Sequence, residues 1–226
     1  MCEAITRIDT AALRRVGGQL GSNPAGLYED PEGRRYYVKT LESAALARNE
    51  RLAAALYALA GAPTLRYVDT VAPHEVATLW QPLDKQQVAH LDAAERAQAQ
   101  HWLGVHAWTA NWDAAGSDGR NQGVSAGRVL TLDVGGALAY RAQGDPKGKA
   151  FGTRVDEIDT LRHEPDNPYA CKLFGDMSDA AVREAIAVVT CLPDAQIRAC
   201  ILAQGGSPAL ADQMVGRKAD LAQRCP

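Results

Sequence analysis

Two carboxylates and one amide near the middle of the chain are residue types that phosphoryl transfer uses. Asp113 ends the run NWD at 111–113, Asn121 follows it, and Asp133 opens the run DVG at 133–135. Phosphoryl transfer needs an acceptor hydroxyl to be oriented and Mg²⁺ to be held on the phosphates of ATP. Carboxylate and amide oxygens are suitable ligands for Mg²⁺, and a carboxylate can also align a hydroxyl. These three residues therefore indicate the chemistry of a phosphotransferase.

A glycine-containing turn near the start of the chain could cover the phosphates. Residues 21–26 (GSNPAG) separate two short stretches with strand character. Glycines let the backbone approach an anion closely, and Ser22 and free N–H groups can donate to it. We therefore predict that Gly21, Ser22, Asn23 and Gly26 contact the nucleotide, with an ordinary hairpin loop as the alternative. The run is not a Walker A sequence, because no Gly-Lys-Ser/Thr ends it and no helix pattern follows.

A lysine and a glutamate further along could hold the phosphates of ATP. Residues 34–39 (RRYYVK) are aromatic and β-branched, as in a strand, and they end in Lys39. Residues 42–60 repeat leucine and alanine at helical spacing, and Glu50 lies in the middle of this stretch. An ion pair between Lys39 and Glu50 would order a phosphate site. The alternative is a solvated lysine and a glutamate on the helix surface beside two arginines.

The ordered set of these motifs resembles the protein-kinase-like superfamily over residues 18 to about 174. The sequences that carry the resemblance are LGSNP at 20–24, YVK at 37–39, RNE at 48–50, ANWD at 110–113, Asn121 and LDVGGAL at 132–138. Within that superfamily the chain resembles HipA-type and phosphoinositide-kinase-like enzymes and the small kinase-like domains of phage proteins and secreted effectors. No single motif is specific, but each falls on the element where that superfamily uses it.

The resemblance implies a role for each residue. Asp113 resembles the catalytic aspartate, Asn121 the magnesium-binding asparagine, and Asp133 the metal-binding aspartate of Asp-Phe-Gly. Lys39 resembles the lysine that holds the α- and β-phosphates and that pairs with a helix glutamate, here Glu50. ATP and Mg²⁺ are the implied cofactors.

The sequence also departs from the family pattern. No His-Arg-Asp precedes the catalytic loop, and the stretch between Asp113 and Asn121 is longer than in kinases. Asp118 is therefore a rival for the catalytic role, unless it is only a turn residue. Lys147 and Lys149 lie where an activation segment is expected, and they could bind a substrate anion or belong to a flexible basic loop. The absence of Ala-Pro-Glu argues against a eukaryotic-type substrate platform.

The fold predicted from these patterns is α+β, with the two lobes of a protein-kinase-like fold. We expect a single kinase-like domain over 1–226, with a small antiparallel β N-lobe and its one helix over about 1–84. A mainly helical C-lobe should follow over about 85–226, with helices expected at 91–110, 181–191, 195–203 and 209–223. The 226 residues, 46% of them hydrophobic, are enough for one compact domain with a real core.

Composition excludes several classes of protein. A net charge of −3 and an isoelectric point of about 6.0 give no basic footprint, so nucleic-acid binding is disfavoured. No apolar run reaches the length of about 18 residues that a membrane helix needs, and the first residues do not form a signal peptide. The five cysteines lack a Cys-x-x-Cys motif, which favours reduced thiols in the cytoplasm. Secretion into a host cell without a classical signal peptide would leave the same pattern.

The leading hypothesis from the sequence is a compact ATP- and Mg²⁺-dependent kinase that phosphorylates a hydroxyl of a target protein. Such an enzyme could be a bacterial effector or toxin, with a host or cellular protein as activator. The enzyme alternatives are a small-molecule kinase of the aminoglycoside or inositol type and an AMP-transferring kinase-like enzyme. A pseudokinase acting as a binding module is the non-enzyme alternative, and the presence of all five kinase residues speaks against it.

Overall fold

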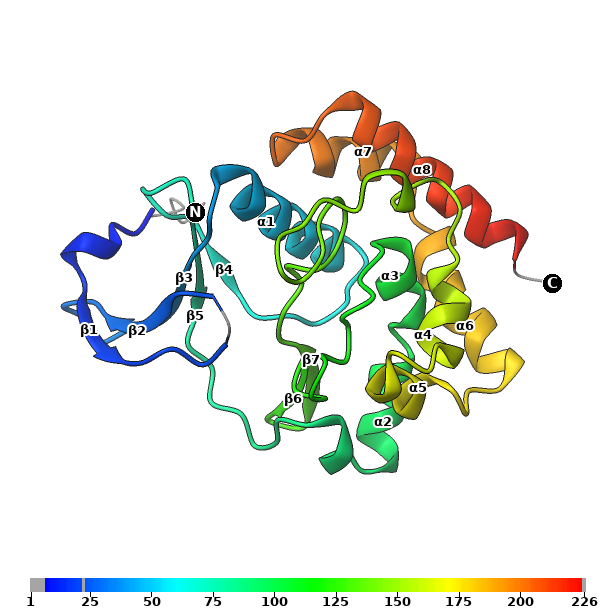
Figure 1. Ribbon diagram of the computed structural model, residues 1–226, viewed down its shortest axis with the longest axis horizontal. Coiled ribbons are helices and arrows are strands. Elements are labelled where there is room, and N and C mark those ends of the chain that lie inside the picture. The colour runs from blue at the N-terminus through cyan, green and yellow to red at the C-terminus, as the bar shows by residue number, and fades with distance from the viewer. Residues whose placement is uncertain (1–6, 22, 225–226) are drawn as a thin grey trace.

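A five-stranded antiparallel sheet forms one part of the molecule, and helices form most of the other (Figure 1). The computed structural model describes residues 7–21 and 23–224. The strands are β1 (Arg14–Gly17), β2 (Ala25–Glu29), β3 (Arg35–Thr40), β4 (Tyr67–Val68) and β5 (Glu75–Leu79), in the spatial order β1-β2-β3-β5-β4. One helix, α1 (Ala44–Leu59), lies between β3 and β4 in the chain.

The alternation of side chains along β3 decides which of its residues face the helical part. Tyr36 and Val38 are buried and pack with Ala77 on one face of the sheet. Because side chains alternate along a strand, Lys39 points to the opposite face, toward α1. Ala25 of β2 is the register partner of Lys39, so the glycine-containing turn before β2 ends beside this lysine.

Helix α1 is amphipathic and begins and ends at clear signals. The Ser43 side chain accepts a hydrogen bond from the Leu46 N–H, as an N-cap does, and Gly61 adopts a φ of 77° directly after the helix. Its buried residues include Glu50 and Tyr57, which lie two turns apart. The helix therefore turns one acidic and one aromatic side chain toward the centre of the molecule.

The remainder is mainly helical, and one β-hairpin interrupts it. Its elements are α2 (Ala93–Gln100), α3 (Leu103–Trp108), β6 (Gln122–Ser125), β7 (Arg128–Thr131), α4 (Glu157–His163), α5 (Pro168–Phe174), α6 (Asp179–Thr190), α7 (Asp194–Ala203) and α8 (Pro208–Gln223), with short 3₁₀ helices at Thr10–Ala12, Val88–His90 and Gly148–Ala150. An antiparallel sheet with one helix, followed by a mainly helical part, confirms the α+β architecture predicted from the sequence. The three predicted C-terminal helices agree with α6, α7 and α8 within two residues at each end.

The single helix predicted over 91–110 is wrong in its continuity. The chain forms α2 and α3 instead, with a break at His101 and Trp102. Helix α3 lies against α6, and at Gly104 an added Cβ would stand 2.1 Å from the Ala185 carbonyl oxygen. Close packing of α3 against α6 therefore gives α3 its own direction. The sequence does not indicate this break, because neither glycine nor proline stands at residues 101 and 102.

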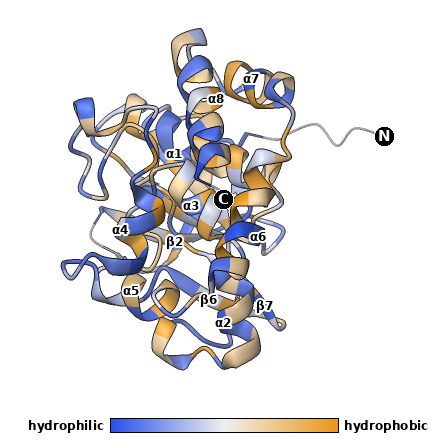
Figure 2. Cartoon of the chain, turned by 90° about the vertical axis from the view of Figure 1, so that its right-hand side faces the viewer, coloured by the Kyte–Doolittle hydropathy of each residue, from blue (hydrophilic) through white to orange (hydrophobic). Residues whose placement is uncertain are grey.

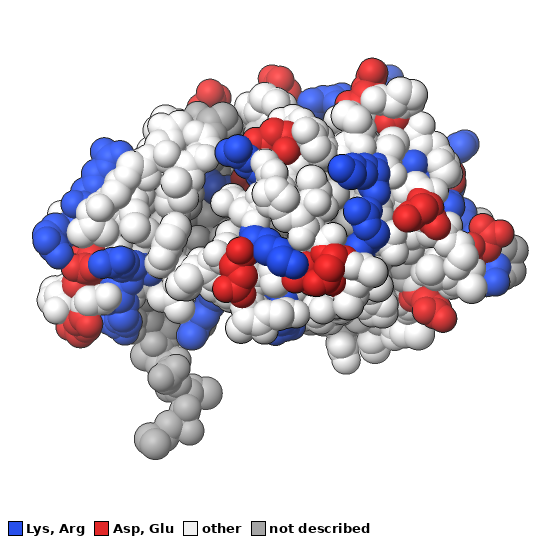
Figure 3. All heavy atoms as spheres, turned by 90° about the horizontal axis from the view of Figure 1, so that it is seen from below, with Lys and Arg blue, Asp and Glu red and all other residues white. Residues whose placement is uncertain are grey.

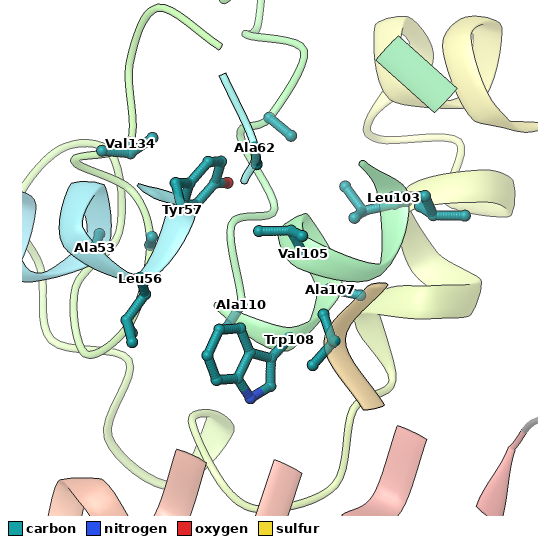
Figure 4. Close-up of a cluster of buried hydrophobic side chains, with 14 of the residues drawn as sticks. Ala53, Leu56, Tyr57, Ala62, Leu103, Val105, Ala107, Trp108, Ala110 and Val134 are labelled. Carbon is teal, nitrogen blue, oxygen red and sulfur yellow. The ribbon is translucent and has the colours of Figure 1, made fainter. Parts of the chain in front are cut away.

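One hydrophobic core extends from α1 into the helical part. Figure 4 shows Leu56 and Tyr57 of α1 facing Val105 and Trp108 of α3, and all four are buried. Amphipathic helices surround this core and carry hydrophilic residues outward (Figure 2). The sheet and the helical part are thus joined by packing at α1 rather than by the connecting chain alone.

Arg217 of α8 is a charged residue within this core. It is fully buried, and its guanidinium donates to the carbonyls of Ala107 and Trp108 at 2.8 and 2.7 Å and to the Glu157 carboxylate at 2.8 Å. The two carbonyls lie at the C-terminal end of α3, where helices leave carbonyls without partners. Arg217 therefore fixes the end of α3, from which the chain enters the loop of Asp113.

The surface has no extended field of one sign on the face seen in Figure 3, where basic and acidic side chains are interspersed. Within the described residues, no single helix is long and apolar enough to cross a membrane. The bent pair α6 and α7 passes by length and composition when taken together. The apolar residues Ile186, Val189, Ile197 and Ile201 of these two helices are buried in the protein core.

Candidate active site

A lysine bridges two carboxylates where the sheet meets the helical part. Lys39 Nζ lies 2.9 Å from Glu50 Oε1 and 2.8 Å from Asp133 Oδ2. The three residues come from β3, α1 and the loop after β7, and Lys39 and Asp133 are 94 residues apart in the chain. The expected ion pair between Lys39 and Glu50 is present, and Asp133 joins it. Tyr67 also donates its hydroxyl to Glu50 Oε1 at 3.0 Å.

Burial and mutual attraction set the ionisation of these groups. Burial alone would lower the pKa of Lys39, but the charges of Asp133 and Glu50 outweigh it and raise that pKa. Burial acts to raise the pKa of Asp133, yet the Lys39 ammonium and the Gly135 N–H hold it below its usual range. For Glu50, burial raises the pKa against the pull of Lys39. Lys39 therefore stays charged, and Asp133 stays an anion.

Gly135 lies between the two carboxylates, where a larger residue would displace at least one of them. Its N–H donates to Asp133 Oδ1 at 2.8 Å. A Cβ added to Gly135 would stand 2.9 Å from Glu50 Oε2 and 3.1 Å from Asp133 Oδ1. The glycine in the DVG run therefore allows the close approach of Glu50 to the loop that carries Asp133.

Asp113 and Asn121 are joined by hydrogen bonds. The Asn121 amide nitrogen donates to Asp113 Oδ2 at 3.0 Å and to the Asp113 carbonyl at 2.8 Å. A Cβ added to Gly136 would stand 3.4 Å from the Asp113 Cβ, so this loop touches the loop of Asp133. Burial, and then the negative charge of Asp133, raise the pKa of Asp113 to about 6, against the hydrogen bond from Asn121. The structure brings the three sequence-predicted residues of the catalytic half together.

Asp118, the rival of Asp113, lies on the surface. Its side chain is 62% exposed, and its carboxylate is 3.4 Å from Arg120 Nε. It also accepts the Arg120 N–H at 3.2 Å, as an aspartate in a turn does. Asp113 is the carboxylate that faces Asn121 and Gly136, so the geometry favours Asp113 for the catalytic role.

The predicted nucleotide-contacting residues separate into loop and strand positions. Asn23 lines the cavity beside Glu50 and Asp133, and Gly21 is exposed with open space around it. Gly26 lies within β2, where an added Cβ would stand 2.9 Å from the Arg15 side chain. Ser22 lies outside the described residues. Gly26 therefore serves packing in this structure, and nucleotide contact by the loop stays a prediction.

A small cavity lies at the centre of these groups. Its volume is about 40 Å³, and it is lined by Asn23, by Leu46 and Glu50 of α1, by Asp133 and by residues 141–144. Ligand pockets typically measure about 300–1,000 Å³. Binding of a nucleotide here therefore requires the glycine-containing turn or residues 141–144 to move away from α1.

The oxygen atoms present fit a magnesium ion that is shared with phosphates. The Asn121 amide nitrogen donates to Asp113. The amide oxygen of Asn121, Oδ1, has no hydrogen-bond partner among the described residues. Asp133 is 39% exposed at its side chain and retains acceptor capacity beyond Lys39 and Gly135. The described residues contain no cluster of three His, Cys, Asp or Glu side chains that could hold a metal by itself. Mg²⁺ is commonly bound through one or two carboxylates and substrate phosphates, which suits Asp133 with Asn121.

Sequence reasoning missed the polar residues that connect these loops. Asn111 donates to the Tyr57 hydroxyl at 2.9 Å, and that hydroxyl lies 2.8 Å from His106 Nδ1. Burial lowers the pKa of His106 to about 3, so it is a neutral core residue. Asn49 bonds the backbone of the Asp133 loop. Nothing in the sequence marks these partners, because they are far apart along the chain.

Comparisons with known proteins give a structural likeness only. No family model and no curated protein matches the sequence. Among solved structures, an aminoglycoside phosphotransferase from Alicyclobacillus acidocaldarius subsp. acidocaldarius is similar with a TM-score of 0.37 and 14% identity, covering 95% of this chain and 93% of that one. The macrolide 2'-phosphotransferase MphH from Brachybacterium faecium is similar with a TM-score of 0.38 and 12% identity, covering 94% and 91%. Similarity at this level leaves the function to be argued from the site itself.

Proposed function

We propose that this chain is an ATP- and Mg²⁺-dependent phosphotransferase that acts on an alcohol hydroxyl. The observation that carries the proposal is the position of Lys39 Nζ within hydrogen-bond distance of both Glu50 and Asp133. A lysine held by a helix glutamate beside a metal-binding aspartate is the arrangement that orders the phosphates in kinases. Asp113 and Asn121 on the adjoining loop support the same proposal.

Each residue has a task that follows from its charge and surroundings. Lys39, fixed by Glu50, would donate to phosphate oxygens and stabilise their negative charge. Asp113 would accept a hydrogen bond from the acceptor hydroxyl and align it for attack, and it is an anion at pH 7 because its pKa is about 6. Asp133 and Asn121 would hold Mg²⁺, which neutralises charge on the phosphates when bound.

We propose a small-molecule acceptor in preference to a polypeptide, the acceptor of our leading hypothesis from the sequence. Residues 139–147 fold into a tight hairpin, in which the Lys147 N–H donates to the Ala139 carbonyl and the Arg141 N–H to the Asp145 carbonyl, each at 2.8 Å. At its tip, a Cβ added to Gly144 would lie 3.3 Å from the Leu46 side chain of α1. Residues 141–144 of this hairpin line the cavity beside Glu50 and Asp133. A cavity bordered by a folded hairpin suits a compact acceptor better than an extended peptide, which needs an open edge or groove.

The decisive experiment follows the γ-phosphate. The purified protein is incubated with γ-labelled ATP and Mg²⁺ together with either the small-molecule fraction or the protein fraction of a cell lysate. Label in a small molecule supports the proposal. Label in a protein would show that the acceptor is a protein instead. Mg²⁺-dependent nucleotide binding without any transfer, unchanged by Asp113→Asn, would instead support a binding module.

A further inference from the structure

The ammonium of Lys147 donates its hydrogen bonds to backbone carbonyls of the protein. Its Nζ donates to the carbonyl oxygens of Ala110 at 2.6 Å, Gly136 at 2.7 Å and Leu138 at 2.9 Å. An ammonium has three protons, so these bonds use its full donor capacity. One carbonyl belongs to the loop of Asp113 and two belong to the loop of Asp133. This excludes the anion-binding alternative for Lys147, because no proton of its ammonium remains for a phosphate.

Two of these carbonyls belong to residues with unusual backbone conformations. Ala110 has a φ of 54° and Leu138 a φ of 56°, in the left-handed region that side chains other than glycine rarely adopt. Such residues cost free energy, and they persist where the surroundings impose them, often at functional sites. Lys147 is bonded to both, so it supports the strained positions of the two loops at once.

Other bonds fix the same two loops to each other and to α1. The Leu138 N–H donates to the Thr109 carbonyl at 2.6 Å, directly before Ala110. Asn49 of α1 donates to the Ala137 carbonyl at 2.8 Å and accepts the Ala139 N–H at 3.2 Å. The backbone around Leu138 is thus held from one side by the helix that carries Glu50 and from the other by Lys147.

Among the described residues, no carboxylate forms a direct ion pair with Lys147. Burial lowers the pKa of Lys147 to about 7, and the charges of Arg217 and Arg141 act in the same direction, while the attraction of Glu157 and the three carbonyl acceptors favour the charged form. Glu157 is bonded to Arg217, and the aromatic ring of Phe151 lies 6.0 Å from Nζ. A buried charge without an ion-pair partner is a poor source of stability. The three contacts of Lys147, which join the loop of Asp113 to the loop of Asp133, therefore bear on the site as well as on the fold.

We propose that Lys147 is a positioning residue for phosphoryl transfer, one whose ammonium joins the loop of Asp113 to the loop of Asp133 and keeps the two carboxylates aligned. This inference rests on the proposed function. Loss of the ammonium would release three buried carbonyls and the left-handed turns at Ala110 and Leu138. Asp113 and Asp133 would then keep their chemistry and lose their relative position.

The first test compares Lys147→Met with Lys149→Met. Lys149 lies two residues on in the same segment, is exposed, and makes no hydrogen bond or ion pair within the described part of the chain. With ATP and Mg²⁺ as the probe and water as the acceptor, Lys147→Met should lower kcat about 10²-fold, the size of effect that a misplacement of about 1 Å produces. KM for ATP and the Kd for MgADP should stay within about threefold, since Lys39 and Glu50 are intact. Lys149→Met should behave as wild type.

A second measurement does not depend on activity. Hydrogen exchange at the amides of Leu138 and Ala139 reports the bonds to Thr109 and Asn49, and it should be faster in Lys147→Met and unchanged in Lys149→Met. Alkylation of Lys147→Cys with bromoethylamine rebuilds a lysine-like ammonium and should restore kcat, with wild type treated in the same way as the control. If Lys147→Met does not fold, Lys147→Gln, which keeps a polar donor, takes its place.

The outcomes separate the two proposals. Unchanged exchange in Lys147→Met, or faster exchange with unchanged kcat, overturns the positioning role while wild-type turnover keeps the phosphotransferase proposal. Lower kcat that the rebuilt ammonium does not restore also overturns it. A wild-type protein that neither binds MgADP nor turns over ATP removes the phosphotransferase proposal and with it the role of Lys147.

Discussion

At the scale of single residues, the surroundings of Asp113 favour its charged form less than the surroundings of Asp133 do. Asp133 has Lys39 at 2.8 Å, whereas the hydrogen-bond partner of the Asp113 carboxylate within the described residues is the neutral amide of Asn121. Asp113 is therefore the basic carboxylate of the pair and Asp133 the permanent anion. Two carboxylates whose environments separate their pKa values are characteristic of a site with divided roles.

Replacement of Asp113 tests its alignment of the acceptor. Asp113→Asn should lower kcat about 10²- to 10⁴-fold, because a general base or orienting carboxylate contributes an effect of that size. The matched control is Asp118→Asn, which changes an exposed aspartate in the same loop and should leave kcat within about threefold. Initial rates of phosphate transfer give both values. A larger loss in Asp118→Asn than in Asp113→Asn would reverse the assignment.

The raised pKa of Asp113 also predicts a dependence of activity and stability on pH. The value of kcat/KM should rise as pH increases through about 6, where Asp113 loses its proton. The folded pKa of about 6 exceeds the unfolded value of about 3.9, so the folded state binds more protons between these values. Stability therefore falls as pH rises from about 4 to 6, and Asp113→Asn should be about 1–3 kcal/mol more stable above pH 7. Denaturant unfolding at pH 4 and pH 8 checks this, since the gain should disappear at the lower pH.

At the scale of elements, the site depends on how closely α1 approaches the loop after β7. Gly135 and Gly136 allow Glu50 and Asp113 to lie against this loop, and Asn49 bonds its backbone. Tyr57 on the same helix bonds Asn111 of the catalytic loop. Helix α1 therefore contacts the loop of Asp113, the loop of Asp133 and Lys39. The position of α1 sets how these three parts of the candidate site lie relative to one another.

Addition of one methyl group at Gly135 tests this close approach. Gly135→Ala should separate Glu50 from the Asp133 loop, because the new Cβ would lie 2.9 Å from Glu50 Oε2. We expect kcat/KM for ATP to fall about tenfold or more, a cost of about 1.4 kcal/mol or above in transition-state stabilisation. Gly18→Ala is the control, because no atom lies within 4 Å of its added Cβ. Equal activities of the two variants would contradict the tight packing at Gly135.

Local sequence patterns could predict the nucleotide-facing part of this arrangement. A strand ending in Lys39 and a following amphipathic helix with Glu50 at its centre specify both elements, and the resemblance to protein-kinase-like sequences indicated that Asp113, Asn121 and Asp133 would lie together. The break between α2 and α3 could not be predicted, because it depends on packing against α6. The hairpin of β6 and β7 was also missed, although Ala126 and Gly127 form its turn with φ values of 49° and 73°.

The role of Lys147 was beyond the reach of local patterns for a different reason. A lysine in a polar, glycine-containing segment has the same appearance whether it faces solvent or the interior. Its three acceptors are backbone carbonyls. Every residue type has one, so the sequence does not indicate which of them accept from a lysine. Only the folded chain distinguishes Lys147 from Lys149.

At the scale of the whole molecule, the nucleotide binding that we propose requires the sheet and the helical part to separate locally. The cavity of about 40 Å³ is bounded by the turn of β1 and β2 on one side and by the hairpin 139–147 on the other. The shared core at α1 holds the two parts together behind this cavity. Opening is therefore expected at these two loops and not at the core.

Binding of MgADP should stabilise the fold as a whole. At a nucleotide concentration of 100 times the Kd, the gain is about 2.7 kcal/mol, which corresponds to a rise in Tm of roughly 5–10 °C for a chain of this length. Lys39→Ala should abolish the rise and Lys149→Ala should keep it, as measured by thermal denaturation with and without EDTA. A rise that persists in Lys39→Ala would place the nucleotide elsewhere.

The guanidinium of Arg217 has a consequence for the order in which the protein can be made. It completes the end of α3 from a position 109 residues downstream of Trp108. While a ribosome is still translating the intervening helices, the emerging polypeptide lacks this contact, and the loop that begins there has no fixed course. The activity that we propose would therefore arise late in biosynthesis, after α8 has left the exit tunnel.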